Sequence, residues 1–462
     1  MLGLILTTLV IVWIIYMLAH KYKPQGVLFA AGIVLMLCTV GFGLGPILTA
    51  KQSTGFVFFD IFEAIKRLFS DRLAGLGLTI MSIGGYVRYM EHCGANQALV
   101  EVSTKPLKLL RSPLAVLMLA YLIGQILNIF VPSHAGLALL LMLTMYPILR
   151  QAGISKLTAC AIIATAKFTD IGPVSSNAVL AAHSAGLDPT IYFIQYQFPV
   201  IWPAVLAVGV THYFLQPWWD KREARAGIAG AAIQEATPEN IPEGTVKEKA
   251  PMVYAILPTL PLILVVTFCP LFVTSIRVDV ITAMLICTVV TMLFEFANYR
   301  KIRPVLENIM TYFEGMGKTF ALVVSLVICA ETFALGLMKI GTVDTLITLA
   351  QDAGLGLVPM VFVISAIMIV SAFLMGSGNA AFFAFASIAP KVSAHLKVEP
   401  VMILLPMELT SGMGRCMSPI AAAIVAIATI AGVSPFQVVK RCVIPVFVAI
   451  VVNMAATYII FL

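Results

Sequence analysis

Long apolar runs divide most of this chain into segments that match the thickness of a lipid bilayer. A helix needs about 20 mostly apolar residues to cross the hydrocarbon core, where its own backbone hydrogen bonds must satisfy every polar group. Such spans are predicted near 2–19, 26–48, 74–92, 113–131, 198–216, 253–275, 279–297, 319–338, 357–375 and 442–461. The pattern therefore predicts an all-α polytopic membrane protein.

Polar segments of two kinds separate the apolar runs. Residues 218–250 form one long polar stretch, rich in Glu, Lys, Pro and Ala, which we interpret as a linker between two halves at 1–217 and 251–462. The shorter stretches 58–72 and 300–313 carry charges between apolar residues, which predicts helices lying in the membrane interface.

The two halves carry the same landmarks at a constant separation. Pro173 corresponds to Pro419, Gly186 to Gly432, Pro189 to Pro435 and Pro199 to Pro445, and the members of each pair are 246 positions apart. A duplication of this size is typical of the internal symmetry of transporters.

Basic residues predict how the two halves are oriented, because cytoplasmic ends of spans favour Lys and Arg. The segment VVKR (438–441) is basic, whereas its counterpart YFIQYQ (192–197) is not. Conversely, KPLKLLR (105–111) is basic, whereas its counterpart QDAGLGLVPM (351–360) is not. In one pair the basic segment is in the second half, and in the other pair it is in the first half. Matched segments therefore lie on opposite sides of the membrane, which indicates an inverted repeat with both termini outside the cytoplasm.

Small and polar residues interrupt the apolar runs at two pairs of matched places. The first pair is PSHAG (132–136) and GSGN (376–379), and the second is TDIGP (169–173) and GMGRCMSP (412–419). Interrupted helices at membrane depth expose N–H groups that attract anions, or carbonyls that bind Na⁺. We expect each half to contribute one re-entrant hairpin and one broken helix to a substrate site. Close packing of glycine-rich helices is the structural alternative.

Ionisable residues within the apolar segments indicate what that site binds. Arg415 has no charged neighbour in sequence nearer than Glu408, and a guanidinium pairs well with carboxylate, so we expect Arg415 to contact an anionic substrate. A structural pair with Glu408 or Asp170 is the alternative. Lys167 and Asp170 have the i,i+3 spacing of a helical ion pair. Glu331 is a candidate proton site or a hydrogen-bonded scaffold residue.

Two histidines, His134 and His183, are candidates for titration, although a buried histidine is more often structural. The candidate substrate-binding residues are Ser133, His134, Gly136, Ser377, Gly378, Asn379, Arg415 and Ser418. The candidates for ion binding or coupling are Asp170, Asn177, Thr410 and Glu331. We expect neither a cofactor nor a metal site, and coupling to Na⁺ or to H⁺ stays open.

Composition supports a membrane protein and argues against other classes. The 462 residues are 60% hydrophobic and 11% charged, and the formal net charge is +7 without a basic, aromatic-rich patch for nucleic acid. The eight cysteines form no CxxC pair. The stretch GMGKT (315–319) resembles the end of a phosphate-binding loop, but Tyr312 stands where that motif requires glycine. Enzymatic function is not expected.

Several longer stretches resemble the DcuC type of C4-dicarboxylate carrier, including its paralogue DcuD. They are YKPQGVLFAAGI (22–33), AGLGLTIMSIGGYVRYMEHCGAN (74–96), KPLKLLRSP (105–113), MGSGNAAFFAFASIAP (375–390), GRCMSPI (414–420) and GVSPFQVVKRCVIPV (432–446). The resemblance covers nearly the whole chain. It implies a homodimer of the ion-transporter superfamily in the bacterial inner membrane, with inverted repeats and two re-entrant hairpins. It also implies uptake, exchange or efflux of succinate, fumarate, malate or aspartate, chiefly under anaerobic conditions.

The resemblance also assigns positions within the proposed site. It implies that 376–379 is a hairpin tip, that Arg415 and Ser418 belong to the paired broken helix, and that Ser133 and Gly136 belong to the other tip. This chain departs from the family pattern at Pro132, at His134 and in 167–170. Because these departures fall at the predicted pocket, the alternative is a carrier for another organic anion or an amino acid. An elevator-like movement is expected in either case.

Overall fold

The computed structural model describes residues 2–20, 22–225, 250–273, 275–342, 345, 348 and 356–461. Every regular element in these ranges is helical. Seven helices there are long and apolar enough to cross a membrane, at Pro24–Gly41, Pro113–Phe130, Pro189–Arg225, Val280–Tyr299, Ile302–Lys339, Leu357–Met375 and Pro435–Phe461. The predicted all-α membrane fold is confirmed.

The helices of the N-terminal part are α1 (Leu2–Ala19), α2 (Pro24–Gly41), α3 (Val57–Arg72), α4 (Leu78–His92), α5 (Ala95–Thr104), α6 (Pro113–Phe130), α7 (His134–Gln151), α8 (Lys156–Thr165), α9 (Ser176–Ser184), α10 (Pro189–Ile191) and α11 (Phe198–Arg225). Those of the C-terminal part are α12 (Leu260–Thr267), α13 (Val280–Tyr299), α14 (Ile302–Asn308), α15 (Met310–Thr319), α16 (Ser325–Lys339), α18 (Leu357–Met375), α19 (Gly378–Phe385), α20 (Ala389–Leu396), α21 (Val401–Cys416), α22 (Ala422–Ala431) and α23 (Pro435–Phe461). Short π-helical turns occur at Leu73–Gly77, Tyr192–Gln197 and Phe320–Val324.

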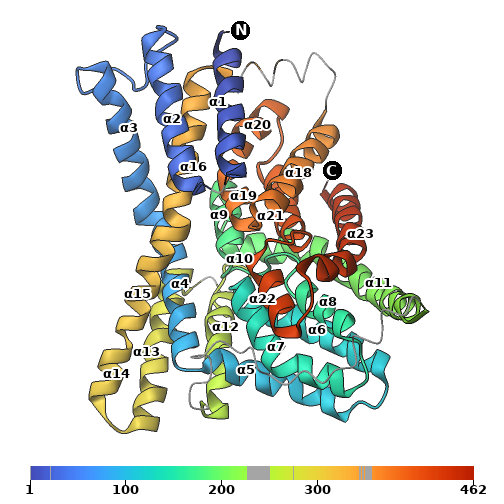
Figure 1. Ribbon diagram of the computed structural model, residues 1–462. Coiled ribbons are helices and arrows are strands. Elements are labelled where there is room, and N and C mark those ends of the chain that lie inside the picture. The colour runs from blue at the N-terminus through green and yellow to red at the C-terminus, as the bar shows by residue number, and fades with distance from the viewer. Residues whose placement is uncertain are drawn as a thin grey trace.

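All three π turns join neighbouring helices into long continuous ones, and Tyr192–Gln197 does so between α10 and α11. Leu73–Gly77 connects α3 to α4, and Phe320–Val324 connects α15 to α16. The stretches predicted to lie in the membrane interface therefore belong to long helices that run side by side with α2 and α13 (Figure 1). The charges on α3 are accommodated by pairing, since Glu63 binds Lys66 and Arg67 along the helix.

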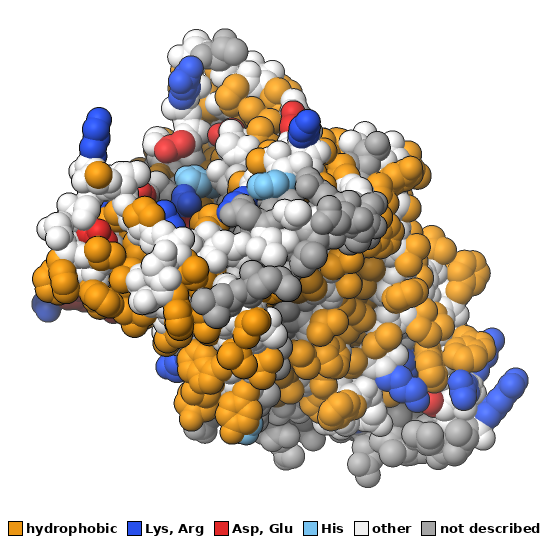
Figure 2. All heavy atoms as spheres, turned by 90° about the horizontal axis from the view of Figure 1, so that it is seen from above, with side chains coloured by type: hydrophobic (Ala, Val, Ile, Leu, Met, Phe, Trp, Pro, Cys, Tyr) orange, Lys and Arg blue, Asp and Glu red, His pale blue; other side chains and the backbone are white. Residues whose placement is uncertain are grey.

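The long helices α2, α3, α4, α13, α15 and α16 form one group in Figure 1, and α6, α7, α8, α11, α22 and α23 form another. The short helices α9 and α19 lie between the two groups. Helix α21 is enclosed by its neighbours, because each of its residues except Met402 is buried. Seen from above, hydrophobic side chains cover much of the outer surface, and charged side chains gather in a few places (Figure 2). Any polar group on α21 is thus held inside protein.

Two predicted boundaries differ from the structure. Helix α11 continues to Arg225, so residues 218–225 of the predicted linker are helical; Arg222 packs on the Trp218 and Trp219 rings there, and Asp220 accepts hydrogen bonds from residues at the start of α8. Residues 226–249 of the predicted linker lie outside the described part. The division of the chain into two halves stays a prediction.

The second difference concerns the helix break that was predicted at 412–419. Helix α21 continues through this stretch to Cys416, and the non-helical segment is 417–421. A Cβ atom on Gly412 would lie 2.6 Å from Thr169 Cα, and one on Gly414 would lie 2.6 Å from the Ile369 carbonyl oxygen. These two glycines therefore serve close packing, which was the structural alternative.

Candidate functional site

The two predicted hairpin tips are the N-terminal ends of α7 and α19. Helix α7 begins at His134 after non-helical 131–133, and α19 begins at Gly378 after Gly376 and Ser377. Ser133 Oγ accepts a hydrogen bond from the Gly136 N–H at 3.0 Å, and Ser377 Oγ accepts one from the Ala380 N–H at 3.2 Å. These caps satisfy one N–H group of each first turn and leave others to face a ligand.

Glycine allows the second tip to sit directly against α21. Gly376 has a φ of 64°, in the left-handed region that glycine tolerates best. A Cβ atom on Gly378 would lie 2.6 Å from the Ser411 carbonyl oxygen. The start of α19 is therefore held in backbone contact with the helix that carries Arg415.

Two buried amides support the non-helical segment between α8 and α9. Asn128 Nδ2 donates to the Thr169 carbonyl at 2.9 Å. Gln197 Nε2 donates to the Asp170 carbonyl at 3.0 Å, and Gln197 Oε1 accepts from the Gly172 N–H at 2.9 Å. These bonds replace the helical ones that the break removes, as buried backbone requires.

Five side chains meet beside this segment, and we call them the Arg415 cluster: Lys167, Asp170, Asn177, Asn379 and Arg415. Arg415 Nη1 donates to Asp170 Oδ2 at 3.3 Å and to Asn379 Oδ1 at 3.1 Å. Lys167 Nζ lies 3.1 Å from Asp170 Oδ1, and Asn177 Nδ2 donates to Asp170 Oδ2 at 3.0 Å. The cluster joins α21, α9, the start of α19 and the α8–α9 segment.

The cluster carries more positive than negative charge. Lys167 and Arg415 share the single carboxylate of Asp170, and the three side chains expose 6% of their surface or less. The charges of all three also act on His134 at the first tip. A buried cation without its own anion is costly, so this arrangement favours the entry of an anion.

Several buried polar atoms close to the cluster have no hydrogen-bond partner among the described residues. They are His134 Nε2, Asn177 Oδ1, Arg415 Nε and Ser418 Oγ. Ser418 lies one turn beyond Arg415, and its N–H donates to the Arg415 carbonyl at 3.1 Å. Native proteins leave few such groups unsatisfied. These atoms offer a ligand both donors and acceptors.

The structure separates the predicted coupling residues into two sets. Asp170 and Asn177 belong to the cluster. Glu331, on α16, instead accepts a hydrogen bond from Arg72 Nε of α3 at 2.6 Å. Thr410 donates to the Pro406 carbonyl of its own helix at 2.6 Å. His183 lies near Arg72 and Gly75 rather than in the cluster. Among the described residues, no side-chain hydrogen bond or ion pair joins Glu331, Thr410 or His183 to Arg415.

Some partners agree with the sequence predictions and others were missed. The Lys167–Asp170 ion pair is present, although its segment is not helical. Of the two structural partners considered for Arg415, Asp170 is the one in contact. Asn128, whose Oδ1 accepts from Lys167 Nζ at 2.5 Å, was not predicted. Its signal in the sequence is an amide within the apolar run 113–131.

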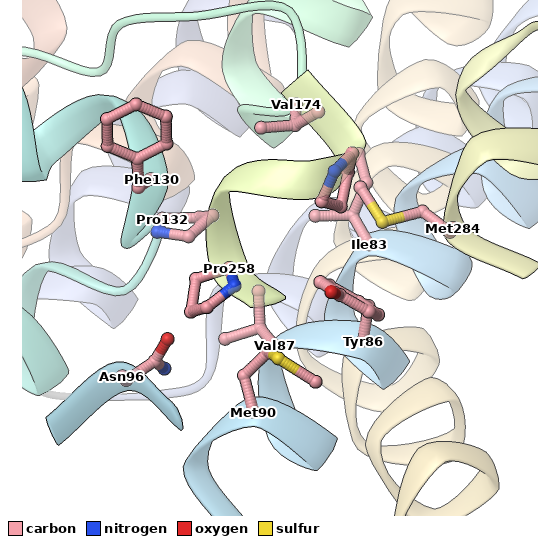
Figure 3. A pocket seen from close by; sticks show the side chains of 11 residues that line it. Ile83, Tyr86, Val87, Met90, Asn96, Phe130, Pro132, Val174, Pro258 and Met284 are labelled. Carbon is pink, nitrogen blue, oxygen red and sulfur yellow. The ribbon is translucent and has the colours of Figure 1, made fainter. Parts of the chain in front are cut away.

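A separate small pocket lies beside the first tip (Figure 3). Pro132 of the α6–α7 connection and Val174 of the α8–α9 segment line it, together with Phe130, Met90 and Pro258. Its described lining includes no charged side chain. A carboxylate would find no counter-charge there, so the Arg415 cluster is the better candidate for an anion site.

Comparison with known proteins identifies the family. The DcuC family, described as C4-dicarboxylate anaerobic carrier, matches residues 2–462. The chain is 33% identical to the probable anaerobic C4-dicarboxylate transporter DcuC of Vibrio cholerae, over 96% of this chain and 94% of that protein. It is 32% identical to the anaerobic C4-dicarboxylate transporter DcuC of Escherichia coli, over 98% and 96%.

Solved structures show a similar fold at low sequence identity. The YdaH transporter of Alcanivorax borkumensis aligns with a TM-score of 0.58 and 14% identity, over 95% of this chain and 98% of that one. MtrF of Neisseria gonorrhoeae aligns with a TM-score of 0.55 and 10% identity, over 95% of each chain. The chain belongs to the DcuC family and is a membrane transport protein rather than an enzyme.

Proposed function

We propose that the chain is a secondary transporter of C4-dicarboxylates such as succinate, fumarate, malate and aspartate, working by uptake, exchange or efflux in the bacterial inner membrane. The names of its relatives support this substrate class. The structural observation that carries the proposal is the charge of the Arg415 cluster, in which two buried cations share one carboxylate.

The cluster and the two tips together fit a short dianion. One carboxylate pairs with the Arg415 guanidinium, whose planar fork suits two carboxylate oxygens. The other carboxylate lies at the N-terminal end of α7 or α19, where free N–H groups and the helix dipole favour negative charge. His134 and Ser418 supply further contacts through their unpartnered atoms. The dianion would thereby offset the one surplus positive charge of the cluster and leave one negative charge uncompensated.

We further propose that the chain is an inverted repeat of 1–217 and 251–462, forms a homodimer and works by an elevator-like movement. Equivalent local structure supports the repeat. The π turns at Leu73–Gly77 and Phe320–Val324 start 247 positions apart, and the serine caps of α7 and α19 are 244 positions apart. Similar elements at matched positions are what duplicated halves predict.

Basic residues support an orientation with both termini periplasmic. The segment 105–111 after α5 and the corner between α13 and α14, which carries Arg300, Lys301 and Arg303, lie at the same end of the molecule in Figure 1. The N-terminus lies at the opposite end. The enrichment of Lys and Arg at cytoplasmic ends makes the α5 end the cytoplasmic one.

One observation favours an amino acid as a second candidate substrate. Asp170 and the unpartnered Oδ1 of Asn177 are acceptors beside Arg415. An amino acid would place its carboxylate on Arg415 and its ammonium group on these acceptors. Competition by unlabelled fumarate, malate, aspartate and monocarboxylic amino acids against labelled succinate distinguishes the two candidates.

The proposal is tested by counterflow of labelled succinate in proteoliposomes, which a channel does not show. We expect saturable counterflow for the wild type and a loss of affinity of about tenfold or more for Arg415→Lys, because an ammonium group lacks the planar fork. Arg441→Lys is the matched control, since Arg441 is also buried but lies outside the cluster. Absence of wild-type counterflow, or equal affinities in the two variants, contradicts the proposal.

A further inference from the structure

Glu408 on α21 is a fully buried carboxyl group held by neutral donors. Its relative exposure is 0%. Gln197 Nε2 donates to both carboxyl oxygens, at 3.0 and 3.1 Å, and the Tyr192 hydroxyl donates to Oε2 at 3.2 Å. The sequence offered Glu408 only as a partner of Arg415, and Arg415 pairs with Asp170 instead. Glu408 therefore has no ion-pair partner among the described residues.

Both residues that donate hydrogen bonds to Glu408 belong to one π turn. Tyr192 is its first residue and Gln197 is its last. Because a π turn bonds residue i to residue i+5, it places Tyr192 and Gln197 on the same face, and such turns are frequent at functional sites. Gln197 also binds the backbone at Asp170 and Gly172. One side chain thus connects Glu408 to the segment that carries the substrate-site carboxylate.

The charged groups that act on Glu408 belong to the substrate site. They are Asp170 and Lys167, and Arg415 lies two turns further along α21. Helices α18 and α19, which also pack on α21, carry no titratable residue. The titratable residues on the other elements packed on α21, besides Tyr192, are Tyr196 on the π turn, His183 on α9, Lys391 and His395 on α20, and Lys440, Arg441, Cys442 and Tyr458 on α23. Of these, Arg441 is held by Asp220 and Glu223.

The charge balance makes the protonation of Glu408 depend on the substrate. The surplus positive charge of the Arg415 cluster is present only while Glu408 is protonated. With Glu408 ionised, Lys167 and Arg415 balance Asp170 and Glu408, and a bound dianion then leaves two uncompensated negative charges. With Glu408 protonated, the same dianion leaves only one uncompensated negative charge. Uncompensated charge in a buried site is costly, so an ionised Glu408 and a bound dianion oppose each other.

We propose that Glu408 is a proton-binding site that takes up one proton when a dicarboxylate binds and releases it when the dicarboxylate leaves. The inference rests on the proposed function for its substrate. Tyr192 and Gln197 hold the carboxyl in place in both protonation states, because Gln197 bonds through its amide and Tyr192 either donates or accepts. Movement of the dianion across the membrane is then accompanied by a proton.

The first test measures the dissociation constant of succinate for the purified full-length protein between about pH 7 and pH 9. Raising the pH ionises Glu408 and adds negative charge, so wild-type affinity falls, approaching about tenfold per pH unit once Glu408 titrates. Glu408→Gln is expected to remove this pH dependence. Glu408→Asp, which keeps a carboxyl group, is expected to retain it, and it serves as the second variant if Glu408→Gln does not fold.

The chain offers a matched control in Glu295 on α13. This carboxyl group is also 0% exposed and is also held by a tyrosine and an amide, since Tyr89 donates at 2.6 Å and Asn308 at 2.9 Å. It belongs neither to the Arg415 cluster nor to the elements packed on α21. We expect Glu295→Gln to keep the pH dependence of the wild type.

The second test imposes H⁺ and Na⁺ gradients separately on proteoliposomes. The wild type and Glu295→Gln are expected to accumulate succinate when an H⁺ gradient drives protons in the same direction. Glu408→Gln is expected to exchange succinate but not to accumulate it in response to the H⁺ gradient. Unchanged pH dependence and unchanged H⁺-driven accumulation in Glu408→Gln would overturn the inference, as would accumulation by the wild type that requires Na⁺ alone. A wild type that does not bind succinate contradicts the proposed function, and this is seen before any variant is compared.

Discussion

Two arginines are buried within this protein, and their surroundings differ in charge. Arg441 on α23 is 1% exposed, and its Nη2 lies 2.8 Å from both Asp220 Oδ1 and Glu223 Oε2. Arg415 on α21 is 5% exposed, and its partner Asp170 lies at 3.3 Å. The first arginine has two carboxylates to itself.

Arg415, by contrast, shares its carboxylate with Lys167. An Nε atom without a described partner occurs on both arginines, so this feature does not distinguish them. The two arginines differ instead in the number of carboxylates available to each cation. An arginine with excess carboxylate is suited to holding helices together, whereas one that shares its carboxylate fits the proposed role of Arg415 in binding an anion. Burial of a charge alone therefore does not identify a transport site.

The largest difference between the two arginines is expected on replacement of Arg415 by alanine. The substrate carboxylate would lose two hydrogen bonds from a charged group, each contributing about 1.5–3 kcal/mol, which corresponds to a loss of succinate flux of at least about 100-fold. The fold and the oligomeric state of the wild type are expected to persist, because Lys167 still balances Asp170. Flux in proteoliposomes and size-exclusion chromatography measure the two outcomes. Flux like that of the wild type would contradict the role of Arg415.

The equivalent change at Arg441 is expected to affect stability and not binding. Arg441→Ala leaves Asp220 and Glu223 without a cation, but their side chains are 30% and 22% exposed, so we expect a loss of roughly 2–3 kcal/mol. Thermal unfolding in detergent measures this loss, and the affinity for succinate is expected to stay within about twofold of the wild type. A large fall in affinity would show that the two arginines do not have separate roles.

The smallest effects are expected at the amides that touch each arginine, and these form a matched pair. Asn379 Oδ1 accepts from Arg415 Nη1, and Gln216 Oε1 accepts from Arg441 Nη1, both at 3.1 Å. A hydrogen bond to a charged group contributes about 1.5–3 kcal/mol, so Asn379→Ala is expected to weaken succinate binding by about tenfold. Gln216→Ala is expected to lower stability only. Equal binding losses in both variants would contradict the comparison.

Much of the geometry of the candidate site was predictable from local sequence. Gly376, Ser377 and Asn379 in an apolar run predicted the tip before α19, and the lone charge of Arg415 predicted an anion contact. Both predictions rest on a rule that acts locally, namely that polar groups at membrane depth need partners. The same rule does not distinguish a break from close packing, and Gly412 and Gly414 were therefore misassigned.

Other parts of the site depended on contacts between distant segments. The coupling roles of Glu331 and Thr410 stay predictions, but the sequence did not indicate that Glu331 pairs with Arg72, 259 positions away. It gave Glu408 no role of its own, and it did not indicate that Tyr192 and Gln197 would hold it. Each of these partners is more than 200 positions from Glu408.

By itself the sequence determined that this chain is an all-helical membrane protein, where two of its helices are interrupted, and which arginine lies close to an interruption. These features follow from hydrophobic length and from the backbone preferences of Gly, Pro and Ser, which act over a few residues. Only the tertiary structure decided which buried charges meet, because helix packing sets the faces that α21, α9 and α19 turn toward one another. The net charge of the buried cluster depends on residues from segments far apart in the chain, so it cannot be read from any one of these segments.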